Sequence, residues 1–186
     1  MTPAQVLERA KELETKSAQE VVAWALETYH PKIALASSFS YEDVAVIDMM
    51  MKVRKDARVF TLDTGRLNAE TYEVMDAIKA KYGLKLEVMF PKHEGTEAMV
   101  RAKGFHSFYD SIENRKECCG VRKVEPLKRM LGTLDAWITG LRREQAVTRT
   151  DTPKVEDDKA FGLIKINPII DWSNEQTIAY VKKNGV

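Results

Sequence analysis

Short runs rich in β-forming residues alternate with helical patterns along this chain, and this alternation constrains the fold more than any other feature. The β-rich runs are residues 32–36, 58–62, 85–90, 135–139 and 163–166. Helical patterns at 42–53 and 69–82 separate the first three runs. This order is typical of parallel βαβ units with right-handed crossovers. It predicts an α/β fold with a mostly parallel sheet flanked by helices.

Helices are also expected near both ends of the sequence. Residues 4–14 and 18–29 have the pattern of two amphipathic helices, and a third is expected at 173–183. A chain of 186 residues with 44% hydrophobic residues can bury one sizeable core. We therefore expect a single α/β nucleotide-binding domain over residues 1–186, with the helices of residues 1–30 at its start. Residues 149–160 have a loop-like composition, and a plain surface loop is favoured over a mobile flap.

The charge balance argues against a polyanionic or membrane partner. The sequence has 29 basic and 28 acidic residues and a net charge of +1, so no global field favours nucleic acid or a membrane surface. It has no apolar run of signal-peptide type and no stretch of 18 apolar residues. Three scattered histidines lack the spacing of a zinc site. The sequence has two cysteines, and we expect both to be reduced thiols. Together these features predict a cytoplasmic protein.

Two adjacent cysteines lie in a basic, charge-dense stretch. The Cα atoms of Cys118 and Cys119 can be only about 3.8 Å apart, less than the roughly 4.4 to 6.8 Å that an ordinary disulfide spans. The two thiols are therefore poor partners for each other. The flanking cations can offset the charge of a thiolate-bound metal centre, and they are Arg115, Lys116, Arg122 and Lys123. An iron–sulfur cluster is the leading interpretation, and two small buried residues on a helix are the alternative.

Three predicted strand ends carry groups that suit an anionic ligand, because ligands of such sheets bind beyond the carboxyl ends of the strands. The first strand leads into Ser-Ser-Phe-Ser at 37–40, whose hydroxyls and free N–H groups could hold phosphate or sulfate. An ordinary capping box of Ser40 with Asp43 would use the same residues. After the fourth strand come Arg142 and Arg143, whose guanidinium groups match phosphate oxygens, or which form a solvated charged turn.

The second strand ends in Leu-Asp-Thr-Gly-Arg at 62–66. Its glycine permits close approach of the backbone, and its aspartate can accept a hydrogen bond from a ribose or base. A strand-to-helix turn would use the same residues. The convergence of three such strand ends with a cysteine pair favours an anion-binding site.

Five segments, taken in order, resemble the assimilatory adenylylsulfate (APS) reductases of the phosphoadenylylsulfate reductase family, which are related to the ATP-pyrophosphatase (adenine nucleotide alpha hydrolase-like) fold. The segments are SSFSYED, LDTGRLNAETY, ECCGVRKVEPLKR, TGLRREQ and INPIIDW, and the resemblance runs from about Ile33 to the last residue. The resemblance implies a modified phosphate loop, an adenosine end and an arginine loop. The modified phosphate loop would contain Ser37, Ser38 and Ser40, and the arginine loop would contain Arg142 and Arg143. The adenosine end would contain Leu62, Asp63, Thr64, Gly65 and Arg66.

The resemblance also implies a metal centre and a catalytic cation. Cys118 and Cys119 would be two of four ligands of a [4Fe-4S] cluster, and the paired cysteines favour APS over its 3′-phosphorylated form as substrate. Lys123 would lie between cluster and substrate. It follows Cys119 by four residues, which is one helical turn if that segment is α-helical.

The reaction implied is the reductive cleavage of APS to sulfite and AMP in assimilatory sulfate reduction and cysteine biosynthesis. A cysteine thiolate attacks the sulfur of APS, and thioredoxin or a similar dithiol then releases sulfite. The family supplies a second Cys-x-x-Cys pair and a nucleophilic cysteine in a carboxyl-terminal segment, and neither motif occurs in this sequence. We therefore expect that segment to be missing here and the chain to be inactive without it.

Several alternatives remain open at this point. They are a phosphoadenylylsulfate reductase, an inactive truncated nucleotide-binding module and an adenylating enzyme of the ATP-pyrophosphatase type. The last is disfavoured because residues 37–40 lack the glycines of a Ser-Gly-Gly-x-Asp-Ser loop. A homo-oligomer is compatible with every one of them.

Overall fold

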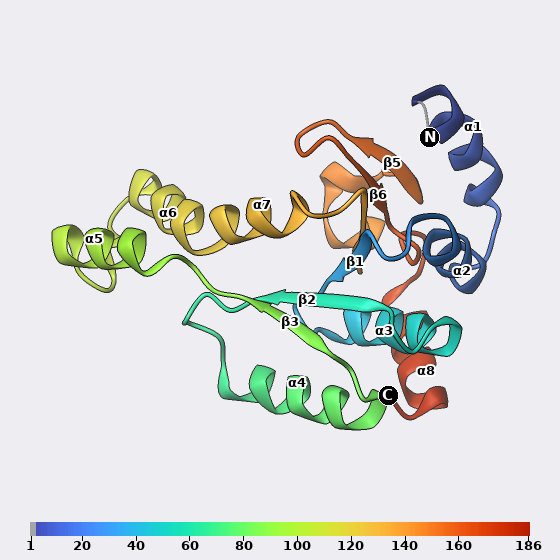
Figure 1. Cartoon of the computed structure of the whole chain (residues 1–186), viewed down its shortest axis with the longest axis horizontal. Coiled ribbons are helices and arrows are strands. Elements are labelled where there is room, and N and C mark those ends of the chain that lie inside the picture. The colour runs from blue at the N-terminus through green and yellow to red at the C-terminus, as the bar shows by residue number, and fades with distance from the viewer. Residues whose placement is uncertain (1–2) are drawn as a thin grey trace.

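A six-stranded sheet forms the centre of the protein (Figure 1), of which the computed structural model describes residues 3–186. The strands are β1 (Ile33–Ala36), β2 (Arg58–Leu62), β3 (Leu86–Met89), β4 (Ala136–Ile138), β5 (Val155–Asp158) and β6 (Leu163–Ile166). Their order is β3-β2-β1-β4-β6-β5, and each neighbouring pair is parallel except β5 with β6. The predicted α/β fold with a mostly parallel sheet is confirmed.

Eight α-helices connect or flank these strands in the described part of the chain. They are α1 (Pro3–Glu14), α2 (Ala18–Tyr29), α3 (Tyr41–Val53), α4 (Ala69–Tyr82), α5 (His93–Lys103), α6 (Ile112–Cys119), α7 (Glu125–Leu131) and α8 (Asn174–Asn184). Capping boxes start α2 at Ser17 and α8 at Ser173. Within residues 3–186, no helix combines the length and the apolar character that crossing a bilayer requires.

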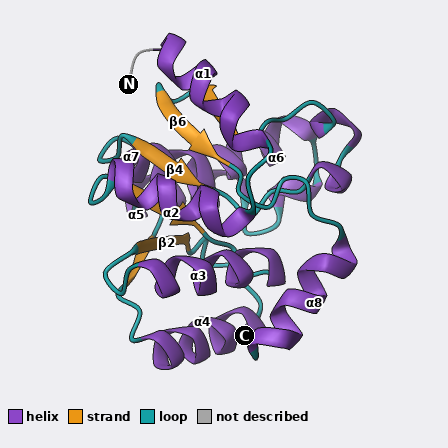
Figure 2. Ribbon diagram, turned by 90° about the vertical axis from the view of Figure 1, so that its right-hand side faces the viewer, coloured by secondary structure: helices purple, strands orange, loops and turns teal. Residues whose placement is uncertain are grey.

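Alternating side chains divide the sheet into two unlike faces. In β1, Ile33 and Leu35 join the larger core, which α2, α3, α4 and α8 cover, whereas Ala34 lies in a smaller cluster beneath α7. Figure 2 shows α3 and α4 stacked below the strands, with α8 beside them. The consecutive methionines at 49–51 are buried in the larger core, as expected of filler residues. The small alanines of β1 leave room on the α7 face.

The strand order reverses between β1 and β4. From β1 the chain moves outward to β2 and β3, then returns to the other side of β1 for β4 and β6. In open α/β sheets such a switch point opens a crevice at the carboxyl ends of the strands. The segments after β1 and β4 are therefore the places where the fold itself favours a ligand.

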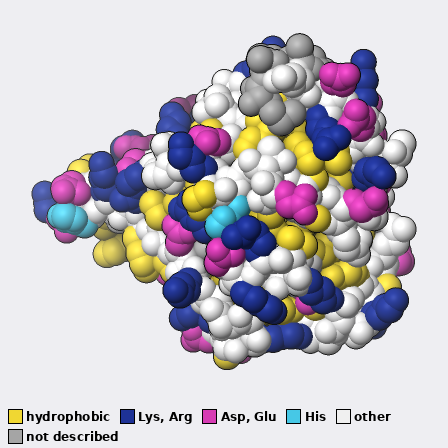
Figure 3. All heavy atoms as spheres, turned by 45° about the vertical axis from the view of Figure 1, so that its right-hand side comes forward, with side chains coloured by type: hydrophobic (Ala, Val, Ile, Leu, Met, Phe, Trp, Pro, Cys, Tyr) yellow, Lys and Arg dark blue, Asp and Glu magenta, His cyan; other side chains and the backbone are white. Residues whose placement is uncertain are grey.

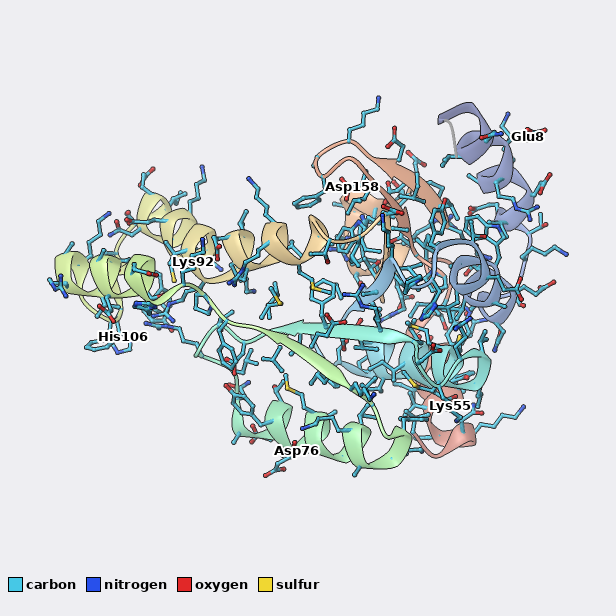
Figure 4. All side chains as sticks on the ribbon, in the orientation of Figure 1. Glu8, Lys55, Asp76, Lys92, His106 and Asp158 are labelled. Atoms are coloured by element: carbon cyan, nitrogen blue, oxygen red, sulfur yellow. The ribbon has the colours of Figure 1, made fainter. Side chains whose placement is uncertain are left out.

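The long connection between β3 and β4 forms an arm that projects from the sheet (Figure 1). It contains α5, α6, a π-helical segment (Gly120–Val124) and α7. Figure 3 shows the arm extending from the body of the molecule with charged side chains scattered over it, and Figure 4 places His106 on its outer part. The sequence pattern did not predict these helices, because α6 buries none of its residues and so has little apolar periodicity.

The expectation of a surface loop at 149–160 is wrong, because this stretch contains β5. Its sequence, Val-Glu-Asp-Asp, carries almost no β-forming signal. Pairing with β6 supplies the missing stability through ladder hydrogen bonds and a cross-strand ion pair of 2.9 Å between Lys165 Nζ and Glu156 Oε1. The sequence of β5 did not predict a strand, because its β conformation depends on pairing with β6.

Candidate functional site

A cavity of about 310 Å³ lies on the α7 face, at the carboxyl ends of β1 and β2, and we call it the strand-end cavity. Its volume is at the lower limit of the roughly 300 to 1,000 Å³ typical of small-molecule sites. Five of the predicted site residues line it, and these are Ser37, Ser38, Leu62, Thr64 and Lys123. They come from three segments far apart in the sequence, so the fold brings together residues of the predicted phosphate loop, residues of the predicted adenosine end and the predicted catalytic lysine.

The loop after β1 is held in a strained conformation. Phe39 has a φ of 61°, in the left-handed region that a bulky residue rarely adopts. Its N–H donates to Ser37 Oγ at 3.0 Å, and the N–H of Ser37 donates to the Phe60 carbonyl at 2.9 Å. Strain of this kind persists only where the surrounding contacts enforce it, and it is concentrated at functional sites.

A capping box of Ser40 with Asp43 was the alternative interpretation of this segment, and it is not formed. Ser40 is the N-cap of α3 but makes no side-chain capping hydrogen bond. Asp43 instead accepts from the N–H and the hydroxyl of Ser38, at 2.6 and 2.8 Å. The carboxylate therefore holds the loop that precedes the helix rather than the helix terminus.

Asp43 also joins the β1 loop to the segment after β4. Burial raises the pKa of Asp43 to about 6, against the hydrogen bonds from Ser38 and from the backbone of Gly140, which favour the carboxylate. A Cβ atom at Gly140 would lie only 2.2 Å from Asp43 Oδ1. Glycine is thus required where the two strand ends meet at the switch point.

The turn after β2 is organised by Asp63. Its carboxylate accepts from the Tyr72 hydroxyl at 2.9 and 3.1 Å and from the Gly65 N–H at 2.8 Å. Gly65 has a φ of 71°, which a side chain would disfavour. These contacts match the strand-to-helix turn that was the alternative interpretation of this segment. They also fix Thr64 in the wall of the strand-end cavity.

Arg66 points away from the strand-end cavity. Its guanidinium donates to the carbonyl of Phe105 and lies 4.6 Å from the ring centroid of Phe108, both in the arm. The family resemblance implied that Arg66 belongs to the adenosine end. In the structure it connects the β2 turn to the arm instead.

Lys123 is the free cation of the cavity. It is exposed, it lines the strand-end cavity, and it forms no ion pair with another residue in 3–186. It lies in the π-helical segment rather than in an α-helix, so the expected one-turn stacking over Cys119 does not apply. An unpaired ammonium beside hydroxyl groups can bind an anionic oxygen with little competition from the protein.

The two arginines after β4 are engaged elsewhere. Arg142 is buried and pairs with Glu42, with 3.0 Å between Nη2 and Oε1, and also with Glu144. Arg143 pairs with Glu14 of α1 and donates from Nε to the Thr152 carbonyl at 2.9 Å. Neither lines the strand-end cavity. Arg143 instead borders a second cavity of about 620 Å³ beside α1 and β5.

The partners of Arg142 hold the start of α3 in place. Burial alone would raise the pKa of Glu42, but hydrogen bonds from the backbone and from Arg142 outweigh it and keep that pKa below its usual value. Gln145 donates to the same Glu42 oxygen at 3.0 Å. Ser40 is exposed at this helix terminus, outside the cavity lining.

The cysteine pair lies at the end of α6, in the arm. Cys118 is half-buried and Cys119 is exposed, and both thiols are free. The alternative of two buried apolar residues is therefore wrong. No cluster of three or more histidine, cysteine or acidic side chains suited to a metal occurs within residues 3–186. The two thiols fit half of a four-thiolate ligand set.

Two further residues of the site were missed by the sequence prediction. Trp137 of β4 lines the strand-end cavity, and its buried Nε1 has no hydrogen-bond partner among the described residues. Arg122 is buried and donates from Nη1 to the Thr64 carbonyl at 2.7 Å. A lone tryptophan in a three-residue strand was the available signal for the first. The second was named in the sequence only as one of the cations flanking the cysteine pair.

Comparison with known proteins gives consistent matches over most of the chain. A profile of the family described as Phosphoadenosine phosphosulfate reductase domain matches residues 32–186. The adenosine 5′-phosphosulfate reductase of Allochromatium vinosum is 43% identical over 154 residues, which are 83% of this chain and 60% of that protein. The chloroplastic 5′-adenylylsulfate reductase 1 of Arabidopsis thaliana is 45% identical over 171 residues, 87% of this chain and 36% of that protein. The chain thus spans about 60% of the length of its bacterial relatives.

Solved structures show the same architecture. The phosphoadenylyl-sulfate reductase of Candida auris, in a phosphate complex, aligns with a TM-score of 0.84 and 28% identity, over all of this chain and 88% of that one. The NH3-dependent NAD synthetase of Campylobacter jejuni aligns with a TM-score of 0.61 at 10% identity, over 100% of this chain and 75% of that one. The second likeness concerns the fold alone, and it confirms the predicted relation to the adenine nucleotide alpha hydrolase-like fold.

Proposed function

Because the chain belongs to the phosphoadenosine phosphosulfate reductase family, we propose that it binds adenylylsulfate (APS) for reductive cleavage to sulfite and AMP. The observation that carries this proposal is the strand-end cavity, where Ser37, Thr64 and the unpaired Lys123 face one space. The bacterial relatives are named for adenosine 5′-phosphosulfate, which favours APS over its 3′-phosphorylated form. A phosphoadenylylsulfate reductase remains the second candidate, because the similar Candida auris protein bears that name.

The proposed reaction transfers two electrons to the sulfur of APS. A cysteine thiolate attacks that sulfur, the bond to the phosphate oxygen breaks, and AMP leaves with the bonding electrons. A dithiol of the thioredoxin type then displaces sulfite from the S-sulfonate and becomes a disulfide. We place this reaction in the cytoplasm, where thiols stay reduced, and in sulfate assimilation and cysteine biosynthesis.

In this reaction the residues of this chain would bind the nucleotide and neutralise the charge of its phosphate. Lys123 would neutralise the phosphate charge that grows as AMP leaves, which stabilises the transition state. Thr64 and Ser37 carry hydroxyl groups that can donate to ligand oxygens, and the buried Trp137 indole N–H can donate to an acceptor nitrogen or oxygen. With Cys118 and Cys119 assigned to a metal centre, the chain as given offers no third thiol as nucleophile.

Arg142 and Arg143 are paired with carboxylates of the protein. Each would have to break its ion pair before it could bind the phosphosulfate. Arg142 would have to leave Glu42 in a buried ion pair, and breaking such a pair is costly. The Arg143 side chain is 31% exposed and pairs with Glu14, so its exchange costs less. Arg143 is therefore the better candidate for a substrate contact from this loop.

AMP binding tests the proposal directly. We expect AMP to bind the chain, to compete with APS, and to change the fluorescence of Trp137 at the cavity wall. Replacement of Trp137 by phenylalanine should abolish most of the signal while Trp24 and Trp172 remain. Titration of both proteins with AMP, by fluorescence and by calorimetry, measures this. An absence of AMP binding at millimolar concentration would exclude the proposed site.

We further propose that Cys118 and Cys119 are two of the four thiolate ligands of a [4Fe-4S] cluster. When bound, such a cluster would supply an electrostatic field near the substrate. The thiols are adjacent, free and accessible, with Arg115 and Lys116 exposed on the same helix. These features support the assignment of the pair as ligands.

Residues 1–186 alone should hold little iron. Two thiolates cannot satisfy a cluster that requires four ligands, so we expect well below one cluster per chain after anaerobic reconstitution. Iron and sulfide analysis and visible absorption measure this, with Cys118→Ser and Cys119→Ser as matched controls. Four irons per chain that survive gel filtration would contradict the ligand count.

A further inference from the structure

Arg122 is an unusual buried cation in the π-helical segment. It is 8% exposed, and its Nη1 donates to the Thr64 carbonyl at 2.7 Å. Its Nε is buried without a hydrogen-bond partner, and no described carboxylate forms an ion pair with it. Burying a guanidinium with a single neutral acceptor and no counter-ion is unfavourable for stability. A role in the site would account for its placement.

The guanidinium contacts the β2 turn closely. A Cβ atom at Gly65 would lie 3.4 Å from Arg122 Nη1, so this backbone turn and the arginine are packed directly against each other. The Thr64 carbonyl that receives the hydrogen bond belongs to a residue that lines the strand-end cavity. Arg122 therefore anchors the arm to the wall of the cavity.

The next residue after Arg122 is Lys123, which lines the same cavity. A long ammonium side chain has several rotatable bonds, so its placement depends on how firmly its backbone is held. Backbone hydrogen bonds join the π-helical segment to the helices on either side of it, since the Gly120 N–H donates to the Glu117 and Lys116 carbonyls and the Glu125 N–H donates to the Gly120 carbonyl. These bonds lie within the arm, whereas the hydrogen bond from Arg122 to the Thr64 carbonyl ties the segment to the β2 turn.

We propose that Arg122 is a positioning residue, which holds the π-helical segment against the β2 turn so that Lys123 stays at the strand-end cavity. The inference rests on the proposed function, because it takes Lys123 as the ligand-binding cation. Arg122 acts through Lys123 and does not contact the nucleotide. This role requires the length of the Arg122 side chain and the planar geometry of its guanidinium group, rather than its positive charge.

A double-mutant cycle tests this coupling. Arg122→Met should weaken AMP binding by about fivefold in the wild-type background, and by less than about twofold when Lys123→Met is already present. Arg122→Lys keeps the charge without the fork and should behave like Arg122→Met. If the losses of AMP affinity in the two single variants add in the double variant, or if Arg122→Lys binds AMP as tightly as wild type, Arg122 acts directly through its charge. Either result would overturn the inference.

A second measurement needs no ligand, so it separates this inference from the proposed function. Hydrogen exchange of the amides of residues 120–124 should accelerate about tenfold in Arg122→Met, because the segment loses its anchor. The matched control is Arg101→Met, at an exposed arginine of α5, which should leave these amides unchanged. Unchanged exchange in Arg122→Met overturns the inference even if AMP binds. Accelerated exchange without AMP binding by the wild type rejects only the proposed function. If Arg122→Met does not fold, Arg122→Lys serves for both measurements.

Discussion

Replacing Lys123 with alanine is expected to weaken the binding of AMP and of APS by tenfold or more. The ammonium has no ion-pair partner among residues 3–186, so its interaction energy is available to the ligand phosphate. A charge-assisted hydrogen bond contributes roughly 1.5 to 3 kcal/mol, and about 1.4 kcal/mol corresponds to a factor of ten in affinity. Calorimetry at fixed ionic strength gives the two dissociation constants. Lys123→Arg should recover part of the loss, since it restores the charge at a different position.

Two controls separate this effect from a general loss of positive charge. Lys128→Ala removes an exposed lysine of α7 outside the strand-end cavity and should change the AMP affinity by less than about twofold. Adenosine, which lacks the phosphate, should bind wild type and Lys123→Ala equally. An equal loss for adenosine and AMP would assign Lys123 to the nucleoside or to the fold rather than to the phosphate.

Replacing Gly140 with alanine is expected to destabilise the fold by about 2 to 4 kcal/mol, because overpacking and a broken buried hydrogen bond add. The new Cβ would lie 2.2 Å from Asp43 Oδ1 and 3.2 Å from the Asp43 backbone nitrogen. Asp43 cannot move away freely, since it is 6% exposed and holds Ser38 through two hydrogen bonds. Urea denaturation followed by circular dichroism measures the free energy of unfolding.

Gly120→Ala is the matched control for this substitution. A Cβ atom at Gly120 would meet no heavy atom of a neighbouring element within 4 Å, and Gly120 has helical dihedral angles, so alanine there should be neutral or slightly stabilising. Gly140→Ala should in addition lower the AMP affinity, because the Ser37–Ser38 loop shifts with Asp43. A Gly140→Ala protein as stable as wild type would show that the two strand ends are not packed as tightly as described.

The sequence alone was sufficient to place five of the six strands described. Residues 58–62 and 163–166 form strands with the predicted bounds, and α2 and α4 likewise, because apolar periodicity reflects burial along one continuous segment. The edge strand β5 and the arm helices escaped prediction. The residues of β5 are mostly acidic, and α6 buries none of its residues, so neither element has the apolar periodicity that identifies a strand or helix from sequence.

The sequence also identified much of the candidate site. Parallel strands end at one edge of a sheet, so Ser37, Ser38, Leu62 and Thr64 were expected together, and all four line the strand-end cavity. Their proposed contacts with a nucleotide remain predictions.

The tertiary structure alone decided which cations are free. Arg142 and Arg143 look available in the sequence, but their carboxylate partners Glu42 and Glu14 lie 100 and 129 residues away along the chain. By its charge pattern alone Lys123 is an ordinary lysine, and only the family resemblance singled it out; the fold gives it no counter-ion in the described residues and places it at the cavity. Residue type and spacing determine which chemistry a segment can offer. The partner of a charge depends on which elements meet in space, and that follows only from the packing of the whole chain.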